Sequence, residues 1–177
     1  MRFVSTEIAG AYVIELEPQC DERGWFARTW CEREFARYGI AAPPRQCSLS
    51  VNVKRGTLRG MHYQAESHAE TKLVTCVRGA IYDVIVDLRS GSPSYKRYVA
   101  VELTADNRRR LYIPAGCAHG FQTLADDTEV HYQMSEFYDP ESARGVRWDD
   151  PAFGIVWPAA PDRIISARDR SYPDFAA

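Results

Sequence analysis

Short runs of alternating apolar and polar residues, separated by turn-forming residues, cover most of this chain. Alternation places successive side chains on opposite faces of a strand, so the pattern predicts β-structure. The clearest run is 82–88, whose apolar residues share one face while Asp83 and Asp87 point the other way. The pattern predicts strands at residues 11–16, 45–53, 57–64, 71–78, 80–88, 95–103, 110–113, 119–124 and 128–137.

Helical spacing is found at about residues 30–38, where Gly39 is the expected stop. The turn-rich segment Arg89–Pro93 follows the run at 80–88, so this run and the next are expected to form an antiparallel pair. Many short antiparallel strands in a chain of this size favour a sandwich or a closed jelly-roll barrel. A small barrel turns alternate side chains inward, which makes ionisable residues on that face candidates for function.

Composition narrows the class of protein. The 177 residues, with 45% hydrophobic and 26% charged content, fit one globular domain. A net charge of −2 argues against general affinity for nucleic acid. The first ten residues lack the apolar segment of a signal peptide, and no window approaches the roughly 18 apolar residues of a membrane span. We therefore expect a cytoplasmic protein with no nucleic-acid or membrane partner.

The cysteines and one basic run receive structural interpretations. The five cysteines are widely spaced without a Cys-x-x-Cys pair, so reduced thiols are expected. Cys76 lies in an apolar run and is predicted to be a core residue, and we favour a non-catalytic interpretation for Cys117 as well. The run Arg108–Arg110 follows two turn-forming residues and is interpreted as a solvated turn.

Two segments set a histidine among glycines and turn residues. Arg55–Gln64 contains His62, and Pro114–Phe121 contains His119. A single histidine in a strand is more often structural than functional. The chain has only four histidines, however, so two such settings favour one shared pocket.

Other side chains complete a set that suits enolate chemistry. Removing a proton beside a ketone requires a base poised near neutral pH, a cation or donor for the enolate oxygen, and an acid. A base and an acid on opposite faces of the carbon invert it without a redox cofactor or a metal. Taken alone, Lys72 would be interpreted as a solvated strand end and Tyr132 as a half-buried aromatic. The set comprises His62, Lys72, His119, Tyr132, Tyr138, Asp169, Arg23, Arg28 and Arg59.

Motifs along nearly the whole length match one known family. They are Asp21–Phe26, Arg55–Gln64, Lys72–Val74, Arg78–Val84, Asp87–Arg89, Leu111–Pro114, His119–Phe121, Tyr138–Pro140 and Gly145–Pro151. With these motifs the chain resembles the dTDP-4-dehydrorhamnose 3,5-epimerase family, RmlC-like cupins that invert centres of a nucleotide-linked 4-keto-6-deoxy sugar. The resemblance implies an all-β fold, a double-stranded β-helix or cupin jelly-roll barrel with a few short helices, as a single domain over residues 1–177.

The resemblance also implies the roles of individual residues. His62 matches the catalytic base, Asp169 its partner, Tyr132 the acid across the sugar, and Lys72 the residue near the C4 oxygen. Substrate-binding residues matched in the same way are Arg23 and Arg59 for the diphosphate, Gln46 and Phe26 for the nucleotide, and His119 and Tyr138 for the sugar. The family uses no cofactor or metal and forms homodimers with exchanged N-terminal strands, so some of these residues are expected to serve the neighbouring subunit's site.

Four substrate-binding positions depart from the family pattern. Where the family commonly has glutamate, asparagine, glutamate and lysine, this chain has Arg28, Ser48, Ala143 and Arg168. Lost polar partners change discrimination strongly when the group that they served is buried. The resemblance therefore implies a dTDP-linked 4-keto-6-deoxy sugar as the favoured substrate and leaves another NDP-linked sugar as the alternative.

The spacing of Arg59 and His62 raises a geometric question. The two residues are three positions apart, so a regular strand would turn them to opposite faces. Either a bulge at Gly60 brings both into one cavity, or Arg59 reaches the partner's site across a dimer. The sequence leaves both arrangements open.

Three other functions stay open at the level of sequence. A single-centre epimerase, inverting only C3 or C5, would keep the same base and acid. Pro114-x-Gly116-x-x-His119 resembles the second motif of metal-dependent cupin oxygenases, yet His62-Tyr63-Gln64 is a poor match to the His-x-His of their first motif. A non-catalytic sugar-nucleotide binding module has little use for an acid and a base that face each other, which makes it the least favoured of the three.

Overall fold

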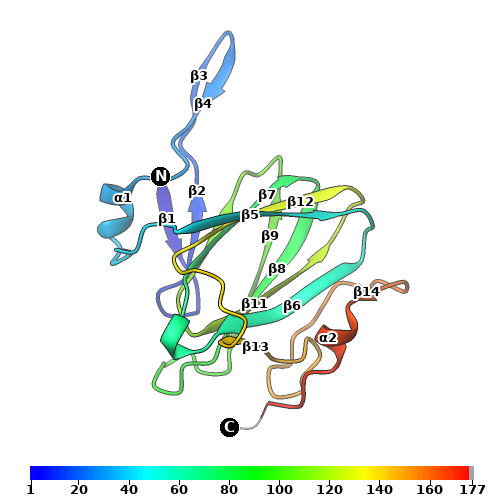
Figure 1. The fold of residues 1–177 in the computed structure, drawn as a ribbon. Coiled ribbons are helices and arrows are strands. Elements are labelled where there is room, and N and C mark those ends of the chain that lie inside the picture. Colours follow the sequence, from blue (N-terminus) through cyan, green and yellow to red (C-terminus); the bar gives the residue numbers. More distant parts are fainter. Residues whose placement is uncertain (176–177) are drawn as a thin grey trace.

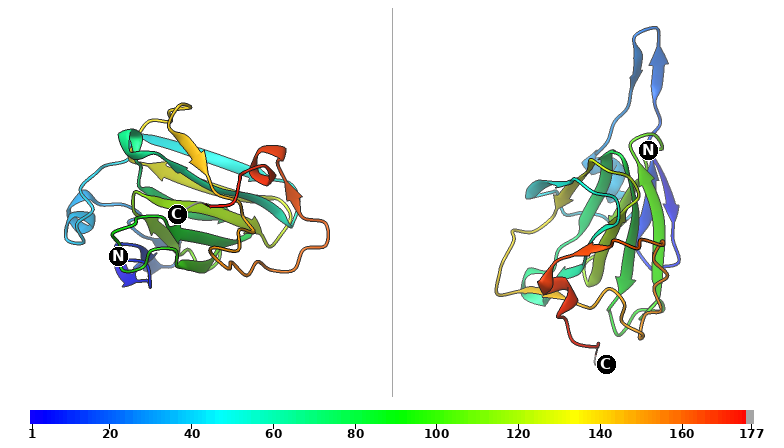
Figure 2. Two further views of the ribbon diagram at one scale, coloured as in Figure 1. Left: turned by 90° about the horizontal axis from the view of Figure 1, so that it is seen from below. Right: turned by 90° about the vertical axis from the view of Figure 1, so that its right-hand side faces the viewer.

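The computed structural model describes residues 1–175 and shows two β-sheets packed face to face (Figures 1 and 2). The first sheet has the strand order β1-β2-β10-β7-β12-β5, and the second has the order β13-β6-β11-β8-β9 with β14 beside β6. Strands distant in sequence are neighbours in both sheets, as in a jelly roll. The predicted all-β jelly-roll barrel is confirmed. The last two residues of the single domain expected over 1–177 lie outside the described residues.

The elements are short. The strands are β1 (Arg2–Ser5), β2 (Tyr12–Glu15), β3 (Gln19–Asp21), β4 (Gly24–Phe26), β5 (Gln46–Asn52), β6 (Thr57–Gln64), β7 (Lys72–Arg78), β8 (Ala80–Asp87), β9 (Tyr98–Thr104), β10 (Arg110–Ile113), β11 (Cys117–Thr123), β12 (Thr128–Met134), β13 (Ala143–Gly145) and β14 (Ile164–Ile165). The helices are α1 (Glu32–Ala36), the 3₁₀ helix η1 (Glu66–His68) and α2 (Ala167–Arg170). No helix among residues 1–175 is long and apolar enough to cross a membrane.

Every strand predicted from alternation is present, and β8 pairs antiparallel with β9 as expected. The largest boundary errors are three residues: the predicted 128–137 strand ends at Met134, and the predicted 95–103 strand begins at Tyr98 because the preceding residues form a turn with Lys96 at a positive φ of 64°. The strands β1, β3, β4, β13 and β14 were missed. Four of these five strands have only two or three residues, which is too short to display a periodic pattern.

Apolar side chains from both sheets fill one end of the space between them. Val74 of β7 and Val130 of β12 pack against Phe121 of β11, and all three are fully buried. Because side chains alternate along a strand, the residues two positions away share this inward direction. Lys72 and Tyr132 therefore also point between the sheets, at the end where the apolar core stops. The same alternation that builds the core places polar groups in the interior.

Both faces of the second sheet are buried. On its outer face, Val84 and Val86 pack against Val146 and Phe153 of the C-terminal segment, which crosses this sheet (Figure 2). The acidic face of β8 therefore points into the barrel, where Asp83 is completely inaccessible. This acidic face points away from Val84 and Val86, as alternation predicts, but inward rather than to solvent.

The structural interpretations of the sequence are mostly confirmed. Cys76 is a core residue. Cys117 is buried, and burial raises the pKa of its thiol to about 12. The solvated-turn interpretation holds for Arg108 and Arg109 but is wrong for Arg110, which opens β10 and is 4% exposed. Its guanidinium donates to Thr75 Oγ1 at 2.7 Å, which anchors it on the outer face of the first sheet.

Candidate active site

A cavity of about 720 Å³ opens between the sheets at the end where the apolar core stops. Its lining comes from both sheets and from α2, which lies beside β6 and β14 (Figure 1). It brings together nine of the residues predicted for the site: Arg59, His62, Lys72, His119, Tyr132, Tyr138, Ala143, Arg168 and Asp169. Residues more than a hundred positions apart in sequence thus meet in one pocket.

A bulge in β6 explains how Arg59 and His62 reach the same cavity. Across the pairing with β11, the three-residue step from Arg59 to His62 faces a step of only two residues. The extra residue falls at Gly60, whose φ is 141° and where a Cβ would lie 2.5 Å from the Cα of Gly120. Only glycine fits such a conformation and such a close approach. The bulge predicted as one of two alternatives is therefore present, and Arg59 lines the pocket of its own chain.

His62 forms a pair with Asp169. β14 runs parallel to β6 and leads into α2, where the Ser166 hydroxyl accepts from the Asp169 N–H at 3.0 Å. Asp169 Oδ1 lies 2.7 Å from His62 Nε2, and Asp169 Oδ2 accepts from the Gly60 N–H at 3.3 Å. Burial alone would raise the pKa of the Asp169 carboxyl, but the hydrogen bond and charge of His62, together with the hydrogen bonds to Gly60 and Ser166, lower it. One imidazole nitrogen is thus held by a carboxylate, while the other has no hydrogen-bond partner within residues 1–175.

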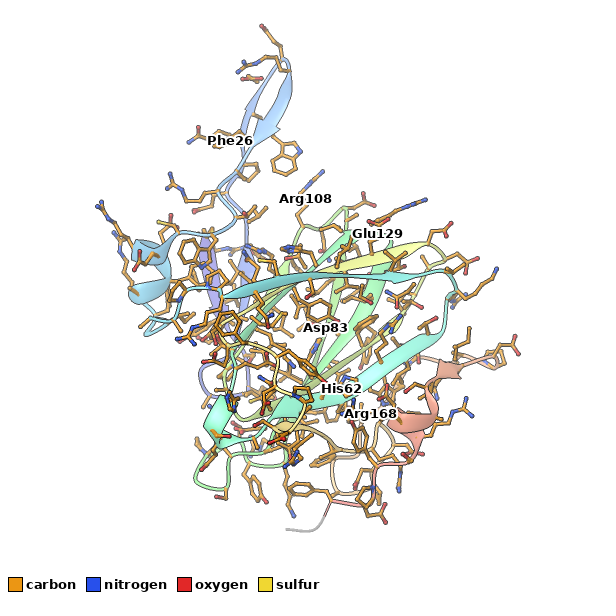
Figure 3. All side chains as sticks on the ribbon, in the orientation of Figure 1. Phe26, His62, Asp83, Arg108, Glu129 and Arg168 are labelled. Atoms are coloured by element: carbon orange, nitrogen blue, oxygen red, sulfur yellow. The ribbon has the colours of Figure 1, made fainter. Side chains whose placement is uncertain are left out.

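A second pair, His119 with Asp83, lies deeper (Figure 3 labels Asp83 between the sheets). His119 Nε2 is 2.7 Å from Asp83 Oδ1, and both side chains are buried. Burial raises the pKa of the Asp83 carboxyl, although His119 and Lys72 oppose the shift. Within the described residues, Asp83 Oδ2 has no hydrogen-bond partner. Sequence reasoning did not select Asp83, although its inward position on β8 was a usable signal.

Tyr132 and Lys72 lie across the cavity on the first sheet. The Tyr132 ring meets the His119 ring edge-on with centroids 5.8 Å apart. Burial raises the pKa of the Tyr132 phenol well above its usual value, and the charge of Asp83 adds to the shift, so the phenol keeps its proton. Lys72 Nζ donates to the His62 carbonyl at 3.2 Å and pairs with Glu70 Oε1 at 3.2 Å. Glu70 was not predicted, although it precedes Lys72 by two positions.

A loop at the pocket mouth carries Tyr138. The buried Gln64 at the end of β6 holds this loop: its Oε1 accepts from the Asp139 N–H at 2.7 Å, and its amide donates to the Phe137 carbonyl at 3.1 Å. Gln46 Oε1 accepts from the Tyr138 N–H at 2.6 Å. Gln46 thus lies behind the loop rather than among the residues that line the cavity.

Four further predicted residues also lie outside the cavity. Arg23 and Phe26 are on the β3–β4 hairpin, which projects away from the barrel (Figures 1 and 3), and Phe26 is 75% exposed. Arg28 follows this hairpin and pairs with Glu34 at 3.4 Å. Ser48 is on β5, two positions before the cavity residue Ser50.

The residues do not form an evident metal centre. Within residues 1–175, no group of three or more His, Cys, Asp or Glu side chains is arranged to hold a metal ion. The second-motif histidine, His119, is engaged with Asp83 instead. The ligand set expected for a metal-dependent cupin oxygenase is therefore not found in the described part of the chain.

Comparisons with known proteins agree with the motifs. The family model described as dTDP-4-dehydrorhamnose 3,5-epimerase matches residues 5–177. A dTDP-4-dehydrorhamnose 3,5-epimerase of Methanothermobacter thermautotrophicus is 44% identical over 173 residues, covering 97% of this chain and 92% of the relative. A crystal structure of the enzyme of that name from Elizabethkingia anophelis superposes with a TM-score of 0.95 at 35% identity, covering 99% and 96% of the two chains. The Bacillus anthracis structure, with TDP and PPi bound, gives a TM-score of 0.93 at 37% identity over 98% and 99%.

Proposed function

Because the chain belongs to the dTDP-4-dehydrorhamnose 3,5-epimerase family, we propose that it converts dTDP-4-keto-6-deoxy-D-glucose to dTDP-4-keto-L-rhamnose. The reaction inverts C3 and C5, the two carbons that flank the C4 ketone. The observation that carries this proposal is the opposition of two groups in one cavity: the His62–Asp169 pair on one sheet side and the protonated Tyr132 on the other.

The proposed chemistry begins at the imidazole. His62 removes a proton from the carbon beside the ketone, and the Asp169 carboxylate stabilises the imidazolium that forms. The Lys72 ammonium stabilises the negative charge that develops on the C4 oxygen, in a pocket shielded from bulk water. Tyr132 then returns a proton to the opposite face, and the carbon is inverted. Proton transfer leaves the oxidation state unchanged, so the proposed reaction consumes no redox cofactor.

Two arginines of the cavity lining, Arg59 and Arg168, are candidates to bind the diphosphate of the nucleotide sugar. Arg59 lies in the cavity with its Nε donating to Asn52 Oδ1 at 2.8 Å, which leaves its terminal N–H groups for phosphate oxygens. Arg168 and Ala143 border the same cavity near Tyr138. The relative from Bacillus anthracis has TDP bound, and this supports dTDP as the nucleotide here.

We also propose a cytoplasmic homodimer in which the projecting hairpin of one subunit completes the pocket of the other. Arg23 and Phe26 are exposed on that hairpin, away from their own cavity. The outer face of β5 and β7 exposes the apolar side chains of Leu49, Val51 and Val77. Apolar residues in such a group favour a protein contact. Mixing Arg23→Ala with His62→Ala protein tests the arrangement, since mixed dimers should recover activity that neither variant has alone.

Proton exchange tests the reaction directly. The protein is incubated with dTDP-4-keto-6-deoxy-D-glucose in deuterated water, and the sugar protons are followed by NMR, with substrate alone as the control. Deuterium at both C3 and C5 is the expected result. Exchange at one carbon would indicate a single-centre epimerase, and no exchange by a folded protein would contradict the proposal. A UDP-linked sugar run in parallel tests the choice of nucleotide.

A further inference from the structure

Tyr172 lies just after α2 and contacts two residues of the site region, Gly145 and His62. It is not among the residues that line the cavity. Its ring packs on Gly145 of β13, where an added Cβ would lie 2.3 Å from the Tyr172 Cζ. Gly145 is the direct pairing partner of His62 across β13 and β6. The glycine therefore creates the space that lets a tyrosine ring lie beside the strand carrying the proposed base.

The Tyr172 ring also meets the imidazole itself. The two rings are in an edge-to-face arrangement, with centroids 6.3 Å apart and planes at 68°. The His62 side chain is 41% exposed, and its ring is held by one hydrogen bond, to Asp169. One hydrogen bond leaves an imidazole free to tilt about that contact. A packed aromatic ring restricts this tilt, because edge-to-face pairs have a preferred geometry.

The hydroxyl of Tyr172 has a second contact. Arg168 Nε donates to Tyr172 Oη at 3.1 Å. Hydrogen bonds to the Tyr138 and Tyr172 hydroxyls raise the pKa of the Arg168 guanidinium. Arg168 and Tyr138 both line the cavity, and Figure 3 labels Arg168 beside His62. The guanidinium is thus held at the cavity wall by the Tyr172 hydroxyl, in the neighbourhood of Tyr138.

We propose that Tyr172 is a positioning residue with two separable actions: its ring fixes the His62 imidazole, and its hydroxyl fixes Arg168 against the bound nucleotide sugar. This inference rests on the proposed epimerase function. A long arginine side chain held at one end loses less conformational entropy when ligand binds. A base held in the attacking orientation accelerates proton removal, since small misplacements of reacting groups are costly.

Two variants separate the actions. Tyr172→Phe keeps the ring and removes the contact to Arg168, so the KM and the Kd for dTDP should rise about three- to tenfold while kcat stays within about twofold. Tyr172→Leu removes the ring as well, so kcat should also fall by about tenfold. Tyr98→Phe is the matched control, since within the described part of the chain the Tyr98 hydroxyl accepts only a 3.4 Å contact from the Val156 N–H, and Tyr98 is not among the residues that line the cavity. It should behave as the wild type.

A readout that does not need turnover keeps this inference distinct from the proposed function. The imidazole resonances of His62 are recorded by NMR in the free protein, and dTDP affinity is measured by calorimetry. Tyr172→Leu should shift the His62 resonances, whereas Tyr98→Phe should not. Absence of exchange in the wild type would overturn the proposed function alone. Unchanged His62 resonances in Tyr172→Leu, or equal loss of kcat in Tyr172→Phe and Tyr172→Leu, would overturn the role of Tyr172.

Discussion

In each of the two histidine–aspartate pairs the nitrogen and oxygen are 2.7 Å apart, but the two pairs differ in their exposure to solvent. His62 and Asp169 lie at the open side of the cavity, where the imidazole is 41% exposed and the carboxyl pKa is lowered. His119 and Asp83 lie between the sheets, and the pKa of that carboxyl is raised. Identical residue types at one distance therefore differ in how readily they carry charge.

The difference comes from what surrounds each carboxyl. Asp169 accepts hydrogen bonds on both oxygens, from His62 and from the Gly60 N–H. Asp83 is bonded through one oxygen, and its burial is complete. Desolvation disfavours the charged form, and donors favour it. The open pair suits a proton that is taken up and released, whereas the closed pair suits a fixed arrangement of donors beside the sugar.

Removing each histidine gives the largest contrast. His62→Ala should lower the exchange rate at C3 and C5 by about 10²- to 10⁴-fold, the usual contribution of a general base, with dTDP binding retained. His119→Ala should act more on KM than on kcat. Single-turnover exchange followed by NMR, together with calorimetry of dTDP, measures both effects. Equal losses of kcat in the two variants would contradict the separation of roles.

Removing the proposed acid, Tyr132, should separate proton exchange from inversion of the carbon. Tyr132→Phe should slow inversion by about 10²-fold or more, because no group then protonates the far face. His62 can still remove a proton and return it to the same face. Deuterium exchange without inversion is therefore expected, and NMR distinguishes the epimers. Inversion at the wild-type rate would exclude Tyr132 as the acid.

The aspartates should differ less than the histidines do. Asp169→Asn should lower kcat by about 10²-fold, since an amide cannot stabilise the imidazolium as a carboxylate does. Asp83→Asn should lower it by about tenfold or less, because His119 keeps a hydrogen-bond partner. Kinetics of both variants beside His68→Ala, a histidine outside the cavity lining, provide the comparison. A larger loss in Asp83→Asn would reverse the assignment of the two pairs.

Stability should show the smallest and most diagnostic difference. The folded-state pKa of Asp169 is lowered, so its stabilising contribution is present above the unfolded value of about 3.9 and lost as pH falls through the folded pKa. The folded-state pKa of Asp83 is raised, so its contribution is present at low pH and lost as pH rises from the unfolded toward the folded value. Urea unfolding at about pH 2.5, pH 4.5 and pH 7 measures both.

The variants should therefore respond to pH in opposite senses. From about pH 2.5 to pH 4.5, Asp169→Asn should lose unfolding free energy relative to the wild type, because only the wild type gains the contribution of the ionised carboxylate. From about pH 4.5 to pH 7, Asp83→Asn should gain unfolding free energy relative to the wild type, because only the wild type has to ionise a buried carboxyl. Parallel pH dependences in the two variants would show that the surroundings of the carboxyls are alike.

Alternation predicted the long strands, whereas the site roles of Lys72 and Tyr132 came from the resemblance, and the structure shows that both side chains line the cavity. The resemblance identified Asp169 as a site residue. Hydrophobic periodicity could not identify it, because α2 is brought to His62 by the parallel pairing of β14 with β6. Glu70, which pairs with Lys72, and Tyr172, which contacts His62, were also missed. Their partners are chosen in three dimensions, and neither residue type is unusual in a surface segment.

The β3–β4 hairpin shows what the sequence of one chain could not predict. Its motif predicted that Arg23 and Phe26 contact substrate, yet both lie outside the cavity of the chain that carries them. A motif identifies a residue's role but does not specify which subunit's site it enters. Burial of Arg110 was missed although a strand was predicted to begin at this residue, because the three arginines were interpreted together as one solvated turn.

The two sheets carry opposite halves of the proposed chemistry, His62 on β6 of one and Tyr132 on β12 of the other. The apolar residues packed between the sheets, Phe121 and Val130 included, therefore set the distance between the proposed base and the proposed acid. The sugar carbon that loses and regains a proton would lie in this gap. In the proposed mechanism, a wider gap would admit water that competes with Tyr132 as the proton donor. Core volume is therefore expected to influence stereochemical fidelity, through side chains that do not line the cavity.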